Sequence, residues 1–152
     1  MESVNVNYLS ESGLPNQTVY ADLVSLYTEI FEDADIVFFK KRVDSQPKIH
    51  IAVAYHDKNL IGFKIGYPYN EDTFYSWVGG ILPAFRRKGI ASQLAKLQEN
   101  YAKEIGFKRL RTKSMNHFKP MMILNLKNGF DVSNIYTNTK GQTKIVFDKA
   151  II

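Results

Sequence analysis

The chain has 152 residues, a length that fits one domain with an ordinary hydrophobic core; 45% of its residues are hydrophobic and 23% are charged. It contains no cysteine, which excludes disulfides, thiolate nucleophiles and cysteine-bound zinc and suits a reducing cytoplasm. The first residues have neither the basic start nor the apolar run of a signal sequence, and no segment approaches the roughly 18 apolar residues of a membrane span. We therefore expect a single cytoplasmic domain, residues 1–152, without a membrane partner.

The net charge of +5 is unevenly distributed along the chain. Residues 1–83 carry 6 basic and 11 acidic side chains, residues 84–119 carry 10 and 2, and residues 120–152 carry 4 and 2. A central basic block after an acidic half indicates a local anion site more than a uniformly basic surface for nucleic acid.

The N-terminal third predicts one strand and two helices. Apolar and polar side chains alternate from Val4 to Leu9, as in a half-buried strand. Asn16 can cap a helix whose apolar residues recur at helical spacing as far as Ile30, and a second, shorter helix is expected over residues 36–43.

The middle of the chain predicts three strands and a long helix. Residues 49–55 and 60–67 flank a four-residue turn and are typical of a hairpin, and a third strand over residues 74–82 ends at Pro83. An amphipathic helix is then expected from residue 89 to residue 105, followed by a glycine at its C-terminal end.

The last third predicts a strand over residues 108–115, a short helix over 121–127, and two strands near 131–136 and 144–148. The resulting order is β-α-α-β-β-β-α-β-α-β-β. This order predicts an α/β (α+β) fold with a mixed central sheet and helices on both faces.

The stretch F-R-R-K-G-I-A-S, residues 85–92, places three cations directly before Gly89 and the start of the long helix. A helix N-terminus offers unpaired N–H groups and a partial positive charge, so an anion there gains hydrogen bonds and favourable field together. The stretch matches neither a Walker loop nor a three-glycine dinucleotide fingerprint. The alternative is that the cations belong to a solvated turn.

These residues resemble the GNAT superfamily of acetyl-CoA-dependent N-acetyltransferases. Its main motif, [QR]-x-x-G-x-[GA], matches Arg86-Arg87-Lys88-Gly89-Ile90-Ala91. Asn116–Phe130, N-H-F-K-P-M-M-I-L-N-L-K-N-G-F, looks like the family's second motif, which usually ends in Gly-Phe. The order of elements is also similar to the family's over nearly the whole chain, and it implies a GNAT-like, mostly antiparallel sheet.

The resemblance implies acetyl-CoA as co-substrate, with the pyrophosphate on the backbone of the basic loop and the pantetheine arm along the preceding strand. The N–H of Ile81 or Leu82 would polarise the thioester carbonyl, and Gly79-Gly80 would form a bulge in that strand. The cofactor-binding residues implied in this way are Gly80, Ile81, Leu82, Arg86, Arg87, Lys88, Gly89, Ile90, Ala91, Ser92, Asn116 and Asn125.

The reaction implied is direct attack of a neutral amine on the thioester, without a covalent enzyme intermediate. The family often supplies a tyrosine to the departing thiolate four residues before the glycine of Gly-Phe, and that position here is Asn125. An asparagine amide can donate a hydrogen bond but cannot deliver a proton. The proton could come from water, from the amine or from another tyrosine such as Tyr75 or Tyr136, and no general base is identified.

The family's acceptor pocket is lined by the two N-terminal helices and their connection. Here that region offers Glu32 and Asp35 beside Phe31, which suggests an acidic, aromatic mouth for a small cationic amine or a peptide amine. The alternative is that the same carboxylates are only helix caps and a solvated face. Three scattered histidines without metal-ligand spacing predict no metal site.

Two other functions compete with this hypothesis. A nucleic-acid-binding module could use the basic residues of 86–119, but no basic, aromatic-rich strand or helix-turn-helix accompanies them, so we expect no nucleic-acid partner. The second competing function is a non-catalytic acyl-CoA-binding or regulatory domain of the same fold. The absence of a tyrosine at position 125 favours it. A homodimer is possible, since dimers are the commonest assembly.

Overall fold

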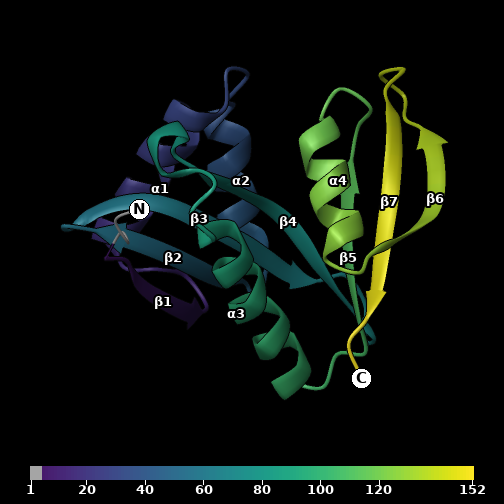
Figure 1. Cartoon of the computed structure of the whole chain (residues 1–152), viewed down its shortest axis with the longest axis horizontal. Helices are drawn as coiled ribbons and strands as arrows, with labels where there is room; N and C mark the ends of the chain where they lie inside the picture. Colours follow the sequence, from purple (N-terminus) through teal and green to yellow (C-terminus); the bar gives the residue numbers. More distant parts are fainter. Residues whose placement is uncertain (1–4) are drawn as a thin grey trace.

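A computed structural model describes residues 5–152 and shows one seven-stranded sheet with helices on both faces (Figure 1). The strand order is β1-β2-β3-β4-β5-β7-β6, and every neighbouring pair is antiparallel except β4 with β5. The strands are β1 Asn7–Ser12, β2 His50–His56, β3 Asn59–Pro68, β4 Thr73–Ile81, β5 Arg109–Ser114, β6 Asp131–Thr137 and β7 Thr143–Ala150. The helices are α1 Gln17–Ile30, α2 Ile36–Ser45, the short 3₁₀ helix η1 Pro83–Phe85, α3 Ile90–Glu104 and α4 Lys119–Lys127. The element order and the mixed, mostly antiparallel sheet confirm the predicted fold class.

The two faces of the sheet carry separate apolar clusters. On one face, Leu23 of α1 and Phe39 of α2 pack against Phe63 and other large side chains of the strands. On the other face, Ile90 and Leu94 of α3 pack against small alanines of β2 and Ile61 of β3. Figure 1 shows α4 on the same side as α3, beside β5, and Phe130 directly after α4 packs in a third cluster with Phe74, Leu110 and the end of α3.

The first strand lies further along the chain than the alternation predicted. Its pairing with β2 runs from Asn7 opposite Tyr55 to Ser12 opposite His50, so the expected end at Leu9 was wrong by three residues. Val4, the expected first residue, lies outside the described residues. The hairpin of β2 and β3 was predicted correctly, and Asp57 and Lys58 at its tip have φ of 48° and 70°, as a type I′ turn requires.

The parallel strands β4 and β5 separate after three residue pairs. The last pair is Tyr75 with Arg111, and one side-chain link follows, the Thr112 hydroxyl donating to the Ser76 carbonyl at 3.1 Å. Beyond it β4 continues beside β3 and β5 continues beside β7 (Figure 1). We call this divergence the fork; in residues 5–152, no strand pairs with one edge of β4 from Trp77 onward.

The predicted bulge at Gly79-Gly80 was wrong. Both glycines pair regularly with β3, and the register shift lies earlier, where Ser76 and Val78 oppose consecutive residues of β3 and Trp77 is the extra residue. Gly80 has a packing reason instead, because a Cβ there would lie 3.1 Å from the side chain of Ile30. The glycine lets the end of α1 approach β4 closely.

Candidate functional site

The loop between β4 and α3 presents a run of unpaired backbone donors. Within residues 5–152, the N–H groups of residues 87 to 92 have no backbone or side-chain acceptor, and the N-cap residue Gly89 supplies no capping side chain. Arg87 and Gly89 both adopt positive φ, 62° and 79°, which turns successive N–H groups outward before the helix begins. Such a turn joined to a helix N-terminus forms an anion cradle.

Gly89 is required by its backbone conformation. A Cβ at this position would meet no atom within 4 Å, but φ of 79° is unfavourable for a residue with a side chain. The space around the cradle is therefore open, and the glycine keeps the turn unstrained.

The three loop cations surround this cradle. Arg86, Arg87 and Lys88 are exposed, and none of them forms an ion pair with a described residue. The Arg86 Nε donates to the carbonyl of Ile81 at 3.0 Å, so this side chain lies along the end of β4. The loop thus combines backbone donors with positive charge that no carboxylate neutralises.

The free edge of β4 leads from the cradle to the fork. The N–H of Leu82 donates to the Ile61 carbonyl at 2.8 Å, so Leu82 faces β3 and cannot serve as the oxyanion donor that the sequence suggested as one of two choices. Ile81 faces the opposite way, because the N–H and carbonyl of a strand residue share one edge and its carbonyl receives Arg86. Of the two predicted donors, only the Ile81 N–H points away from β3.

Asn125 is the one buried residue of α4, with 8% of its surface exposed. Its backbone carbonyl accepts from Phe130, but its side-chain amide has no hydrogen-bond partner in the described part of the chain. Asn116 is exposed just after β5, where its carbonyl accepts from the ammonium of Lys119 at 2.6 Å. A nearly buried amide without a partner is suited to a ligand contact.

Tyr75 lies at the fork, on the face covered by α1 and α2. Burial, with a smaller contribution from neighbouring Tyr67, raises the pKa of Tyr75 to about 12. Its hydroxyl, which has no hydrogen-bond partner among residues 5–152, therefore stays neutral at neutral pH and acts as a donor rather than a base. The ring of Tyr75 packs edge-on against that of Tyr67 at 5.5 Å between centroids.

Arg42, Tyr67 and Lys113 adjoin Tyr75 and were not identified from the sequence. The Arg42 guanidinium donates to the Tyr67 hydroxyl at 2.6 Å, and the Lys113 ammonium lies 5.7 Å from the Tyr75 ring centre. Alternation along β5 could have placed Lys113 on the face of Arg111, but no pattern in the sequence connects residue 42 with this strand.

The predicted acidic acceptor residues are less well placed. The Asp35 carboxylate accepts from the Phe38 N–H at 3.0 Å and caps α2, while Glu32 is exposed and has no ion-pair partner within residues 5–152. The ring of Phe31 packs at a tilt against that of Tyr27, 5.1 Å between centroids, and reaches the vicinity of Gly80. Of these three residues, Phe31 is the one that approaches β4, at Gly80 on the face covered by α1.

Polar side chains lie buried beneath α3. His50 is 1% exposed and stacks on Tyr101 at 4.1 Å, and neither of its ring nitrogens has a hydrogen-bond partner among the described residues. The Gln98 amide nitrogen is also unpaired. Burial lowers the pKa of His50 to about 4 and that of Lys64, a β3 residue opposite Gly79, to about 8. Desolvation disfavours the charged form of both groups.

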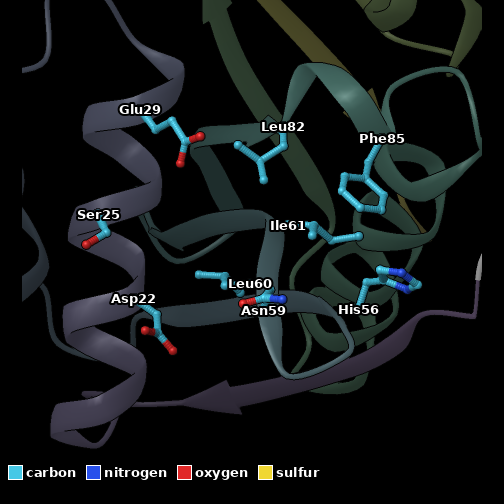
Figure 2. Close-up of a pocket in the computed structure, with 9 residues that line it drawn as sticks. All are labelled: Asp22, Ser25, Glu29, His56, Asn59, Leu60, Ile61, Leu82 and Phe85. Carbon is cyan, nitrogen blue, oxygen red and sulfur yellow. The ribbon is translucent and has the colours of Figure 1, made fainter.

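A cavity of about 390 Å³ lies at the far end of β4 from the fork. Figure 2 shows Asp22 and Glu29 of α1 on one side, His56 of the hairpin below, and Leu82 and Phe85 on the other side. At about 3.3 Å per strand residue, Leu82 is roughly 20 Å along the chain from Tyr75. The cavity is thus separate from the fork.

Among residues 5–152, no three histidine, aspartate or glutamate side chains converge as metal ligands. No helix in the described part of the chain has the length and apolar character needed to cross a membrane.

Comparisons with known proteins agree on one family. A family model described as the acetyltransferase (GNAT) family matches residues 16–130. No curated protein matches the chain in sequence. Among solved structures, Ard1 from Thermoplasma volcanium superposes with a TM-score of 0.81 at 15% identity, over 98% of this chain and 99% of that one.

Two further structures superpose over nearly their full length. A GNAT family acetyltransferase from Elizabethkingia anophelis, solved with acetyl-CoA bound, gives a TM-score of 0.76 at 19% identity, over 96% of this chain and 98% of that one. The ribosomal-protein-S18-alanine N-acetyltransferase from Escherichia coli gives 0.76 at 13% identity, over 94% of both chains. At these identities the superpositions show the fold, while the family match covers most of the chain. The chain therefore belongs to the GNAT family and is an acetyltransferase.

Proposed function

We propose that the protein transfers an acetyl group from acetyl-CoA to the primary amine of a small molecule or peptide, by direct attack of the amine. The observation that carries this proposal is the run of unpaired N–H groups from residue 87 to residue 92 beside the free edge of β4. One anion-binding cradle continuous with one open strand edge suits a ligand that has a pyrophosphate and an amide-containing arm.

The residues present fit acetyl-CoA. The cradle would hold the pyrophosphate, with Arg87 and Lys88 supporting the phosphates. The free edge of β4 at Gly79 and Ile81 would pair with the pantetheine arm, and Gly80 between them, whose backbone groups face β3, would leave space beside it. Bound in this way, the coenzyme supplies an activated acetyl thioester. The Ile81 N–H is free of β3, but it lies roughly 20 Å along β4 from Tyr75, so it would hydrogen-bond the pantetheine arm while the thioester carbonyl lies nearer the fork.

The amine must lose a proton before or during attack, because an aliphatic amine with a pKa of ~10.4 is protonated at neutral pH. Asn125 cannot supply a proton, so its amide would stabilise the departing thiolate as a hydrogen-bond donor. Tyr75 can donate similarly through its unpartnered hydroxyl, but its raised pKa makes it a weaker acid than a thiol of about 8.5. We infer that the thiolate takes its proton from water or from the amine.

The charge of the acceptor is a separate question. The hypothesis of a small cationic amine depended on Glu32 and Asp35, and the capping bond of Asp35 gives that carboxylate a structural role. The fork instead carries Arg42 and Lys113, which are positive. This charge pattern gives a cationic acceptor little support.

The alternative of a non-catalytic acyl-CoA-binding domain rests on Asn125 in the usual tyrosine position, whereas the match to the acetyltransferase family supports the enzyme. Turnover separates the two. Purified protein is incubated with acetyl-CoA and a panel of amines, and release of free thiol is followed together with the mass of the acetylated amine. Stoichiometric acetylated product supports the enzyme, and thermal stabilisation by acetyl-CoA without any product supports the binding domain.

The protein's location and assembly stay proposals. A cytoplasmic location is supported by the absence of cysteine in the sequence. A homodimer is supported by apolar side chains exposed on β6 and α4, which include Val132, Ile135, Ile123 and Leu126. Light scattering during size-exclusion chromatography measures the assembly directly.

A further inference from the structure

Two cationic side chains approach the fork from different elements. Arg42 comes from the last turn of α2, and Lys113 lies on β5 two residues beyond the last residue paired with β4. Both are partly buried. Neither takes part in an ion pair within residues 5–152, where the pairs are His56 with Asp57, Arg111 with Asp148 and Lys149 with Glu99. Partly desolvated cations without a counter-charge favour the binding of an anion.

Aromatic rings surround both cations without satisfying their hydrogen-bond donors. The Arg42 guanidinium lies 4.9 to 6.0 Å from the ring centres of Phe38, Trp77 and Tyr67. The Lys113 ammonium lies 5.4 to 5.9 Å from those of Tyr136, Tyr75 and Tyr69. These contacts orient the cations but use no N–H donor.

Most of the donors in this cluster are therefore available. Of the five N–H donors of Arg42, one is used, by the Tyr67 hydroxyl at 2.6 Å, and Lys113 forms no hydrogen bond with a residue in the described range. The neighbouring Arg111 differs, because it forms two bonds to the Asp148 carboxylate at 2.8 and 3.0 Å. Arg111 is therefore neutralised by a bidentate carboxylate. Arg42 and Lys113 have no such carboxylate within residues 5–152.

The tyrosine pair joins the two cations into one cluster. Tyr67 receives Arg42, Tyr75 lies beneath Lys113, and the two rings are 5.5 Å apart. Tyr75 is also the last β4 residue paired with β5, so the cluster lies where the free edge of β4 begins. A ligand held here reaches the opening of the fork.

We propose that Arg42 and Lys113, with the hydroxyl of Tyr75, bind a carboxylate of the acceptor, so that the acceptor is an amino acid or an acidic peptide. This inference rests on the proposed acetyl transfer to an amine. The ligand's carboxylate pairs with Arg42 and Lys113 in the way that Asp148 pairs with Arg111. The amine of the same molecule extends toward the fork.

The first experiment compares acceptors that differ only in the group far from the amine. Each ω-amino acid from glycine to 6-aminohexanoate is assayed beside the alkylamine and the diamine of equal length, at saturating acetyl-CoA. A second arm compares short peptides with Asp, Asn or Lys at the second position. In one of the two arms, we expect kcat/KM to be about 10-fold to 100-fold higher for the carboxylate acceptor than for its matched acceptor without a carboxylate. One or two charge-assisted hydrogen bonds would give a difference of this size. The arm that shows it distinguishes free amino acids from peptides.

Variants test whether the two cations cause the preference. Arg42→Gln and Lys113→Gln should each lower about 10-fold the ratio of kcat/KM for the carboxylate acceptor to kcat/KM for the matched alkylamine, and leave the KM for acetyl-CoA within about threefold. Lys41→Gln is the control, an exposed cation beside Arg42 on α2. Arg42→Lys should keep part of the preference, since charge remains without the planar fork.

Calorimetry gives a readout that does not require turnover. The N-acetylated product of the best carboxylate acceptor is titrated into protein saturated with coenzyme A, and we expect wild type to bind it about 10-fold more tightly than Arg42→Gln. Turnover of amines without carboxylate preference, or product binding insensitive to both variants, would overturn the carboxylate site and leave the acetyltransferase proposal standing. Failure to bind acetyl-CoA at all would overturn both.

Discussion

Backbone groups lead to the fork on the face of the sheet covered by α3, whereas side chains line the fork on the face covered by α1 and α2. The first approach consists of six N–H groups and a strand edge, with one glycine setting the turn. The second consists of Arg42, Lys113 and Tyr75, which come from α2, β5 and β4. A site made of backbone tolerates change in most side chains, whereas a site made of side chains changes its ligand when one residue is replaced.

The two kinds of construction also suit different partners. A coenzyme is constant, so a backbone cradle whose shape depends on one left-handed turn can bind it with few residues fixed. An acceptor is recognised by charge and shape, which side chains supply. Variants on the two faces should therefore fail differently, those on the α3 face in coenzyme binding and those on the other face in the choice of acceptor.

The largest effect is expected from Gly89→Glu. The substitution adds a side chain at φ of 79° and a negative charge inside the cradle, so at least two charge-assisted hydrogen bonds to the coenzyme should be lost. Affinity for acetyl-CoA should fall about 1000-fold or more, and stabilisation of the protein by acetyl-CoA in a thermal unfolding assay should disappear.

Gly141→Glu is the matched control. Gly141 has φ of 76° and open space around its Cβ position, but it lies in the turn between β6 and β7. Its variant should lose a similar small amount of stability and keep the full response to acetyl-CoA. An equal loss of coenzyme binding in both variants would mean that strain, and not the cradle, explains the result.

His50 provides the next largest effect, in the core beneath α3. Its pKa is about 4 in the folded protein and about 6.5 when unfolded, so between these values the unfolded chain binds a proton that the folded chain does not. Stability should therefore fall as the pH drops from about 6.5 to 4, by about 3 kcal/mol from this residue. Denaturant unfolding at pH 7 and pH 4 measures it.

His50→Leu should remove that part of the pH dependence, and His117→Leu, which replaces an exposed histidine, should leave it intact. Leucine has no ring nitrogens to leave unpaired, so the variant should be at least as stable as wild type at pH 4. A wild-type stability that is flat between pH 6.5 and 4 would show that His50 gains a proton without cost and is less enclosed than its 1% exposure indicates.

The contrast between the faces also explains what could be predicted from the sequence. The cradle was predicted because its residues are consecutive, and Gly89 followed by an amphipathic helix has a local physical meaning. The cluster of Arg42, Tyr67 and Lys113 was missed because three distant segments meet only through packing.

The bulge shows the same limit at one strand. Two glycines suggested it at residues 79 and 80, but glycine in a strand also permits close approach of another element, and the end of α1 uses Gly80 in that way. The extra residue, Trp77, is large and apolar and gives no local sign of irregular pairing. Packing of its ring on Phe39 of α2, at 5.6 Å, depends on the completed fold.

A smaller effect is expected from Asn125→Ala, on the α3 face. If the amide donates to the departing thiolate, kcat should fall about 10-fold while the KM for acetyl-CoA changes less than about threefold, because the bond forms only as charge develops. Lys127→Ala, at an exposed position near the end of the same helix, is the control. A raised KM with unchanged kcat would instead make Asn125 a residue that positions the coenzyme.

The smallest effect separates the two hypotheses about the acceptor. Because the Asp35 carboxylate caps α2, Asp35→Ala should cost about 1 kcal/mol of stability, while Asp35→Asn, which keeps a good cap, should cost little. Neither variant, nor Glu32→Gln, should change the acceptor KM, because these side chains cap or face solvent while Arg42 and Lys113 select the charge. A several-fold rise in KM for cationic amines in both Glu32→Gln and Asp35→Asn would restore the acidic mouth and argue against the carboxylate site.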